Sequence, residues 1–477
     1  MRVSSRVRSV KAFGSVAAAA LLGVVGVPAV AGAQAASSDQ VTFSKHVLPI
    51  LQRSCQNCHR PGSLAPMPFI TYEDVRPWAR SIKAKTAQRE MPPWFIEKNV
   101  GIQKYKDDIS LSDAEIAAIG KWVDAGAPRG NPADAPPARV FKDADKWSFE
   151  PDLIVTSPAH TLKAVAADWY GLLDSSPTGL TEDRYIKAVE VKEVRLKDDS
   201  AVKRKAGDLS LFVVHHAVIT ANPRGGDDVI STQTGAEQQL PQYRRQRARY
   251  DGGNFMLTHE VGQNATFYHD DIGVKLAANS ALTWDLHLHS IGVEMPFKIE
   301  VAYKFHPKGY KPKYVAGGGL ESFLTFDLDI PQNDPNAKLE GIMRVAQPGM
   351  LATFEPHLHS SGKRMCIDAI YPSGFAETLS CAGYNHNWVK VYAYDDDVVP
   401  LLPVGTLLKV TAWYDNTDKN PRVVDPRNWK GYGNRSIDDM FLMLGRYVPM
   451  TDEQFKEAVA ARDAKQKASR GRATQQQ

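Results

Sequence analysis

A C-x-x-C-H motif stands at residues 55–59, and its chemical groups are Cys55, Cys58 and His59. Two thiols at this spacing can bond to the vinyl groups of a haem, and the adjacent histidine can ligate the haem iron. We therefore predict one covalent haem c that is attached through both cysteines and ligated by His59.

Two methionines and a histidine are candidates for the second axial ligand of this haem. We favour Met91, because the two prolines that follow it would stiffen its loop. Met67, which lies between two prolines, is the rival, and His46 is a more distant third. A methionine ligand raises the reduction potential of the haem. Iron with two protein ligands would transfer electrons rather than react with oxygen.

Histidines also occur in three close pairs, each inside an apolar run of strand-like composition: His215 and His216, His287 and His289, and His357 and His359. Side chains two residues apart on a strand point to the same face, so each His-x-His pair could give one metal ion two imidazoles. Adjacent histidines point to opposite faces of a regular strand, so the first pair could share an ion only at a bend or a strand end. Three such pairs in one chain favour metal binding over histidines that only form hydrogen bonds.

The elements that must position these residues fall into regions of different composition. Residues 41–130 carry helical patterns, including a capping box in which Ser112 precedes Glu115 at the start of an expected helix over 114–124. A linker rich in proline and alanine follows at 126–137. From about residue 148 onward, short runs of β-branched and aromatic residues alternate with turn residues, which is typical of β-sandwiches. Prolines and glycines between 306 and 319 predict a second linker.

The predicted fold is therefore multidomain. We expect a small all-α cytochrome c domain at 41–130, followed by two all-β, jelly-roll-like sandwich domains at 148–310 and 318–450. The polar tail, 451–477, predicts a short helix that frays.

Residues 1–35 predict a signal peptide, because positive residues precede a short apolar run and small-residue cleavage sites. No other segment approaches the roughly 20 apolar residues of a membrane span. We expect a mature protein without a membrane span, in the periplasm or secreted. In such an oxidising compartment Cys366 and Cys381, the cysteines outside the haem motif, most simply form a disulfide. A net charge of +4 without a basic stripe gives no reason to expect a nucleic-acid partner.

The region from about 148 to 450 resembles the copper type II monooxygenases, which include peptidylglycine α-hydroxylating monooxygenase and dopamine β-hydroxylase. It looks most like bacterial members that carry a cytochrome c domain in front. The resemblance implies a first copper held by His215, His216 and His287, although His289 stays open as the third ligand. It implies a second copper held by His357, His359 and Met440, which follows an acidic residue as the family's methionine does.

Two positions depart from the peptide-amidating members of this family. Glu355 stands where those enzymes have an arginine for the substrate carboxylate, and Leu442 stands where they have an asparagine. Peptidylglycine is therefore not the expected substrate, and a neutral, cationic or apolar small molecule fits better.

The resemblance implies that the second copper binds O2 beside the substrate, that a C–H bond is hydroxylated, and that the two coppers face each other across open solvent. The fused haem predicts that a periplasmic donor supplies the electrons, which pass from the haem to the first copper. One alternative is a non-catalytic electron carrier whose β domains bind copper or a partner. Another is an oxidase or dehydrogenase that passes electrons from the substrate to the haem.

Overall fold

The computed structural model describes residues 40–61, 65, 67–141, 147–198, 212–222, 256–316, 321–325, 327–433, 435 and 437–474. The elements below all belong to one compact unit, Val41–Gln477. The predicted signal peptide lies outside the described residues. Among those residues, no helix combines the length and the apolar character that crossing a membrane requires.

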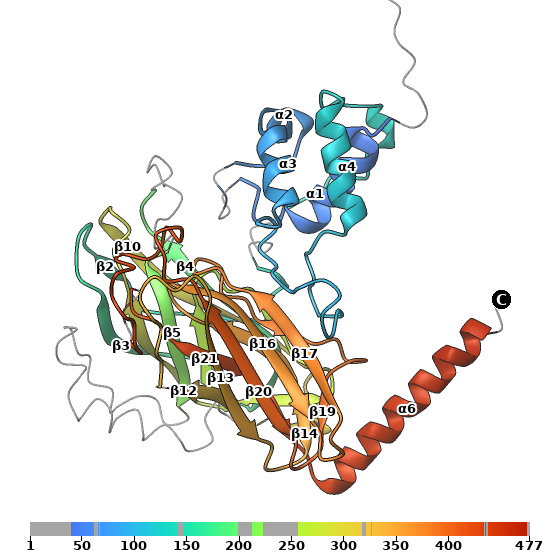
Figure 1. Cartoon of the computed structure of the whole chain (residues 1–477), viewed down its shortest axis with the longest axis vertical. Coiled ribbons are helices and arrows are strands. Elements are labelled where there is room, and N and C mark those ends of the chain that lie inside the picture. Colours follow the sequence, from blue (N-terminus) through green and yellow to red (C-terminus); the bar gives the residue numbers. More distant parts are fainter. Residues whose placement is uncertain are drawn as a thin grey trace, which may run out of the picture. The chain divides into compact units, whose positions relative to one another are not determined.

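The helices before residue 135 are short: η1 (Phe43–Val47), α1 (Leu48–Ser54), α2 (Tyr72–Val75), η2 (Arg76–Trp78), α3 (Ala79–Ala87), α4 (Asp113–Asp124) and η3 (Pro132–Asp134). The predicted capping box is confirmed, because the Glu115 amide donates to the Ser112 hydroxyl at the start of α4. Buried side chains from η1, α1 and α4, among them Leu51, Ile119 and Trp122, share a small hydrophobic core in this region (Figure 1).

The prediction of an all-α cytochrome c domain at 41–130 is wrong. In the described part of 41–130 the α-helices are only these four short ones, and the protein is built mainly of β-sheets. Residues 94–106, which we call the strap, instead run beside the β region. Ile96 forms a β-bridge with Ala382, and the Ile102 amide donates to the Leu379 carbonyl at 2.8 Å. Proline lacks an amide donor, so Pro92 and Pro93 stop helix formation, and the strap satisfies its backbone against strands far away in the sequence.

The first β half contains β1 (Leu153–Thr156), β2 (His160–Leu162), β3 (Trp169–Pro177), β4 (Arg184–Arg195), β5 (Val214–Asn222), β6 (Met256–Glu260), β7 (Thr266–Phe267), β8 (Ile272–Leu276), β9 (Ala281–Leu288), β10 (Met295–Phe305) and β11 (Tyr314–Val315). One sheet has the order β1-β10-β4-β8-β11, with β2 and β7 at its side. The other sheet has the order β3-β9-β5-β6. Seven of the eight residues of β9 are buried, as a strand between two others requires.

The second β half contains β12 (Glu321–Thr325), β13 (Ala337–Arg344), β14 (Gly349–Leu351), β15 (Thr353–His357), β16 (Gly362–Ile370), β17 (Ala376–Gly383), β18 (Tyr392–Ala393), β19 (Leu401–Leu402), β20 (Leu407–Tyr414), β21 (Phe441–Gly445) and β22 (Tyr447–Pro449). Its sheets have the orders β12-β21-β15-β18, β13-β20-β16-β17 and β19-β14-β22. Strands β13, β20, β16 and β17 lie side by side in Figure 1. Cys366 and Cys381 face each other on β16 and β17, and the predicted disulfide between them is confirmed.

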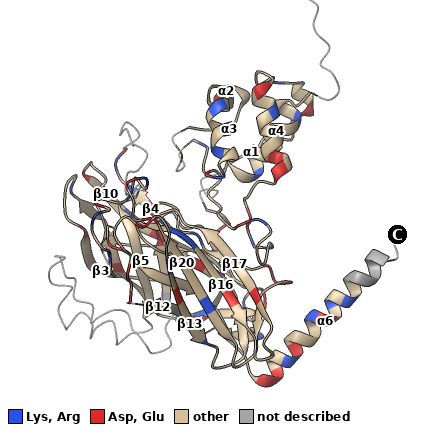
Figure 2. Cartoon of the chain, in the orientation of Figure 1, with Lys and Arg blue, Asp and Glu red and all other residues tan. Residues whose placement is uncertain are grey.

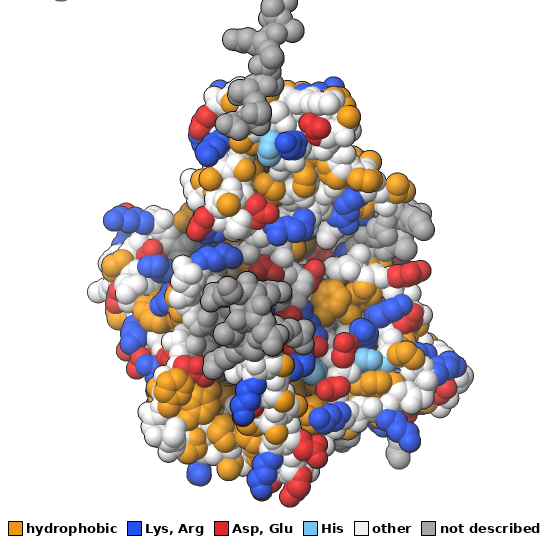
Figure 3. Space-filling model, turned by 90° about the vertical axis from the view of Figure 1, so that its right-hand side faces the viewer, with side chains coloured by type: hydrophobic (Ala, Val, Ile, Leu, Met, Phe, Trp, Pro, Cys, Tyr) orange, Lys and Arg blue, Asp and Glu red, His pale blue; other side chains and the backbone are white. Residues whose placement is uncertain are grey.

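One continuous hydrophobic core contains buried residues of both β halves and of the strap, including Trp94, Trp284 and Phe354. The helix α6 (Asp452–Thr474) follows β22, and in Figure 2 acidic residues lie at its start and basic residues further along its described part. Acidic, basic and hydrophobic side chains are also interspersed on the face shown in Figure 3, where only isolated histidines reach the surface. Most of the histidines considered below are buried.

Candidate metal centre

The first histidine group is built on the neighbouring antiparallel strands β5 and β9. His216 is paired with His287, and the register shifts between Val214 and His216. His215 therefore occupies a β-bulge, which releases it from the alternation of a regular strand. One nitrogen from each of His215, His216 and His287 can be chosen so that all three lie within 4.8 Å of one another. The bulge supplies the bend that two adjacent histidines need to share an ion.

A carboxylate and an aromatic ring from the β3 side hold His287 in place. Asp168 Oδ2 lies 3.1 Å from His287 Nε2, and the Tyr170 ring stacks on the imidazole with centroids 4.1 Å apart. Nδ1 of His287 then faces Nδ1 of His216 at 3.3 Å. Two nitrogen ligands, each about 2 Å from a tetrahedral ion, are also roughly 3.3 Å apart. Asp168 thus acts as the carboxylate partner that orients a ligating histidine.

The second group lies where β15 and β21 end. The ladder of β15 and β21 ends with His357 opposite Leu442, and Met440 lies two residues before Leu442 in the sequence. The rings of His357 and His359 have centroids 5.1 Å apart, and Met440 is buried. The pairing of Leu442 with His357 and the hydrogen bond from the Ser361 hydroxyl to Asp439 therefore place the chain around Met440 near the histidine pair that the family resemblance assigns to the same ion.

The two groups meet in one buried cluster, which differs from the expected separation across open solvent. The ring centroids of His215 and His359 are 5.2 Å apart. His289 lies 5.1 Å from His215, and so does His386, which the sequence analysis had not placed in any site. We call His215, His216, His287, His289, His357, His359 and His386 the histidine cluster.

Several ring nitrogens of this cluster are buried without a hydrogen-bond partner among the described residues: both nitrogens of His215, both of His386 and Nε2 of His359. Burial, aided by neighbouring imidazoles, holds the pKa values of these three histidines well below the ordinary value. A neutral imidazole is the form that binds metals, and an unpaired buried polar group costs about 1–3 kcal/mol. The donor set therefore fits bound metal, and imidazole with thioether suits copper.

A buried carboxylate connects the second histidine group to the first β half. Glu260, at the end of β6, pairs with His216 in the ladder, and its Oε2 lies 3.1 Å from His357 Nδ1. Next to it, Gln263 donates to Glu355. Burial, and then the nearby Glu260 carboxylate, raises the pKa of Glu355 well above its usual range.

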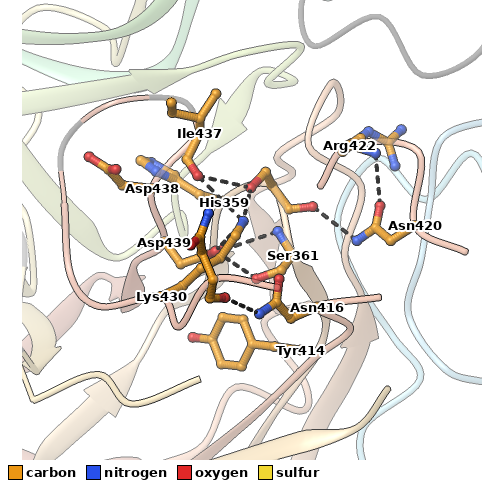
Figure 4. A network of polar contacts seen from close by, with 12 residues as sticks. His359, Ser361, Tyr414, Asn416, Asn420, Arg422, Lys430, Ile437, Asp438 and Asp439 are labelled. Carbon is orange, nitrogen blue, oxygen red and sulfur yellow. Dashed lines mark hydrogen bonds and ion pairs between the residues drawn. The ribbon is translucent and has the colours of Figure 1, made fainter. Parts of the chain in front are cut away.

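A polar network holds the segment that precedes Met440 (Figure 4). Buried Asp439 accepts from the Ser361 hydroxyl at 2.6 Å and from the Lys430 ammonium at 3.1 Å. The Arg435 carbonyl lies 3.1 Å from His359 Nδ1. This contact occupies Nδ1 and leaves Nε2 of His359 for a metal.

A hollow of about 910 Å³ adjoins this network. Lys430, Arg435 and Asp438 line it together with the aromatic rings of Trp429 and Tyr432. Lys430 and Arg435 thus take part both in the hollow and in the contacts around Ser361, Asp439 and His359. The hollow is the candidate binding place for a small molecule.

The haem motif forms a compact turn after α1. The amides of Cys58 and His59 both donate to the Cys55 carbonyl, and neither cysteine forms a disulfide. His59 Nδ1 lies 3.1 Å from the Met67 carbonyl, and the ring stacks on Phe69 with centroids 4.1 Å apart. A main-chain carbonyl on Nδ1 fixes the tautomer that leaves Nε2 for iron. The residues of the motif therefore fit a covalent haem.

The candidates for the second axial ligand occupy different places. The Met67 carbonyl is hydrogen-bonded to Nδ1 of His59, which is not the nitrogen, Nε2, that is left for iron. His46 accepts a hydrogen bond from the Thr42 amide through Nδ1. Met91 is half-buried after α3, directly before Pro92, and its amide donates to the Lys85 carbonyl. Met91 stays our prediction.

Sequence reasoning missed three residues of the centre: Asp168, Glu260 and His386. Asp168 and Glu260 are single carboxylates without a motif around them. His386 lacks a second histidine one or two positions away, and that spacing was the signal that singled out the other pairs.

No family model and no curated protein matches this chain. Among solved structures, the cowpea mosaic virus top component is similar at 9% identity and a TM-score of 0.27, over 63% of this chain and 91% of that one. The major capsid protein P2 of bacteriophage PM2 gives 9% identity and a TM-score of 0.25, over 62% and 96%. PNGF-II gives 10% identity and a TM-score of 0.25, over 64% of each chain. At these TM-scores the similarities carry no argument about this chain.

Proposed function

We propose that this protein is a periplasmic, haem-linked dicopper monooxygenase that hydroxylates a C–H bond of a small organic substrate with O2. The observation that carries the proposal is the histidine cluster with its unpartnered buried nitrogens. Its first group would hold one copper through His215, His216 and His287. Its second group would hold another copper through His357, His359 and Met440.

Copper in these positions would supply oxygen activation and one-electron transfer, and a haem at Cys55, Cys58 and His59 would supply electrons from a periplasmic donor. Other residues of the protein orient the histidines that would bind copper. Asp168 and the Arg435 carbonyl each engage one nitrogen of a histidine, so the other nitrogen is left for the metal. The thioether of Met440 would favour the reduced ion at the second position, because soft ligands prefer Cu(I).

The hollow beside the second group is the place where the substrate would bind. Trp429 and Tyr432 offer aromatic faces, and the carboxylates of Asp327 and Asp329 line the hollow beside the ion pair of Asp438 with Arg435. Aromatic faces attract cations. These residues support a neutral or cationic substrate rather than a carboxylate, in line with Glu355 at the position where peptide-amidating enzymes use arginine.

The test is the ratio of copper to haem in purified, copper-loaded protein, for the wild type and for Met440→Ala. We expect two coppers per haem, falling toward one in Met440→Ala because one site loses its soft ligand. Met450→Ala is the matched control, since Met450 is equally buried but lies after β22, outside the cluster. Wild-type protein that takes up no copper would contradict the proposal.

The alternative is a non-catalytic c-type cytochrome that carries electrons and whose β region holds copper or a partner. The burial of the cluster favours it, because His287 and His359 have no exposed surface through which a substrate could reach an ion.

One experiment distinguishes the two functions. The haem of copper-loaded protein is first reduced by a donor, and O2 is then added with candidate substrates. A monooxygenase reoxidises the haem while hydroxylated product forms; a carrier yields no product.

A further inference from the structure

Beyond the ligands named so far, we propose that His386 is a metal ligand of the histidine cluster, placed between its two histidine groups. This inference rests on the proposed copper binding and extends it to a residue that no sequence pattern assigned.

The position of the His386 ring is the first argument. Two imidazoles that share a tetrahedral ion, each nitrogen about 2 Å from the metal, have ring centres roughly 5 Å apart. His386 lies 5.1 Å from His215 of the first group and 6.0 Å from His359 of the second. His215 and His359 are themselves 5.2 Å apart. The His386 ring therefore lies between the two groups, at ring-centre distances close to those of imidazoles that bind one metal ion.

The unsatisfied nitrogens of His386 are the second argument. The side chain is 1% exposed, and neither ring nitrogen has a hydrogen-bond partner among the described residues. A neutral imidazole carries one donor and one acceptor, so this burial leaves both unmet. A core histidine without a metal normally hydrogen-bonds to a carbonyl or a carboxylate, as His359 does through Nδ1. A metal ion would satisfy the acceptor nitrogen of His386.

The loop of His386 is held against the first β half, which fixes the ring in place. The Asn387 carbonyl lies against Gly262, where an added Cβ would come within 2.3 Å of the carbonyl oxygen. The Val389 amide donates to the Val261 carbonyl at 2.9 Å. Glu260, which contacts His357, directly precedes this segment. The same short segment therefore positions His386 and a partner of the second histidine group.

The experiment compares wild type, His386→Ala and His386→Gln in copper affinity and in the EPR spectrum of bound Cu(II). Copper is titrated in competition with a chelator, and folding is checked by circular dichroism. We expect one copper to bind at least about 10-fold more weakly in both variants, since even residues that only orient ligands cost that much. We also expect changed nitrogen couplings, and free imidazole should restore the wild-type spectrum in His386→Ala by filling the vacated space.

His306→Ala is the matched control, because His306 is buried but stacks on Tyr310 outside the cluster. It should leave copper affinity and spectrum unchanged. If wild type binds copper while both His386 variants keep its affinity and spectrum, the role of His386 is refuted and the proposed function stands. If wild type binds no copper, both are refuted.

Discussion

At the scale of single residues, the candidate centre is a set of imidazoles whose burial is unfavourable unless something satisfies their nitrogens. Desolvation disfavours the charged imidazole, so buried histidines stay neutral, and burial lowers the pKa of His289 to about 4. Neutral imidazoles with open nitrogens cannot stabilise a protein core by themselves. Bound metal would satisfy these nitrogens, whereas a core without metal would leave them unpaired at a cost in free energy.

Asp168 provides a prediction about metal affinity. Asp168→Asn removes the negative charge beside His287 Nε2 and leaves the strand intact, so the imidazole becomes a weaker and less well oriented ligand. We expect copper affinity at the first group to fall by about 10–100-fold. Chelator competition measures this. Asp174→Asn is the control, because Asp174 is exposed on β3, the strand that begins directly after Asp168. Equal affinities in the two variants would contradict the role of Asp168.

Lys390 provides a prediction about stability and pH. Burial lowers the pKa of this lysine from 10.5 to about 8, although the nearby carboxylates of Glu190 and Asp107 act in the opposite direction. The folded state then binds fewer protons than the unfolded state between pH 8 and 10.5, so stability rises with pH across this window. Below the window the penalty is about 3 kcal/mol at roughly 1.4 kcal/mol per pKa unit.

Lys390→Met should abolish this rise. The Tm of wild type should increase between about pH 8 and 10 relative to that of the variant. Lys409→Met is the control, because Lys409 is less buried and should leave the pH dependence as in wild type. Parallel Tm curves for wild type and Lys390→Met would show that Lys390 is not desolvated in the folded protein.

At the scale of elements, two local irregularities do most to place the ligands. The bulge in β5 turns His215 toward the same place as His216 and His287. The ladder of β15 and β21 ends with His357 opposite Leu442, each two residues from His359 and Met440 respectively. Both are properties of strand pairing and not of one strand alone.

The strap gives the element-scale prediction. Trp94 packs edge-on against Tyr392, with ring centroids 5.0 Å apart, and belongs to the core of the β region. Trp94→Ala should therefore lower the stability of the β region by about 3–5 kcal/mol, through the cavity that it leaves. Thermal unfolding followed in the near ultraviolet measures this. Trp429→Ala, at a position that is 61% exposed, is the control. A Tm equal to that of the control would show that the strap does not pack as described.

How far the sequence predicted these elements depends on how local their causes are. The capping box of Ser112 and Glu115 acts within one turn, and it predicted α4 to within one residue. The apolar run from Leu407 to Tyr414 coincides with β20. The strap was missed because its partners lie nearly three hundred residues away, and no local pattern encodes that pairing. The residues of the site likewise fall into those that a local pattern predicts and those that only long-range contacts bring in.

Pairs of histidines could be found from spacing, because i and i+2 share a strand face. The bulge at His215 depends on the register between β5 and β9, which follows from the packing of the whole sheet. His386 and Asp168 enter the site only through such long-range contacts. The family resemblance, and with it the function, stays a prediction.

At the scale of the whole molecule, the short stretch from residue 386 to 390 links the two candidate cofactor sites. His386 belongs to the histidine cluster, and Lys390, four residues later, lies within electrostatic range of the Cys58 sulfur of the haem motif. Electrons that enter at the haem motif would therefore have a short path along this stretch toward the cluster. The path would pass through residues of the β region and would need no rearrangement of domains.

The double variant Cys55→Ala/Cys58→Ala tests this division of labour. It cannot attach haem, but it should bind copper as wild type does, because every proposed copper ligand lies between residues 215 and 440. A protein-sized electron donor, too large to reach a buried cluster, should bleach the Cu(II) EPR signal of wild type and leave that of the variant. Ascorbate, a small reductant, is the control and should reduce both. If the large donor reduces copper equally fast in both proteins, electrons do not enter through the haem motif.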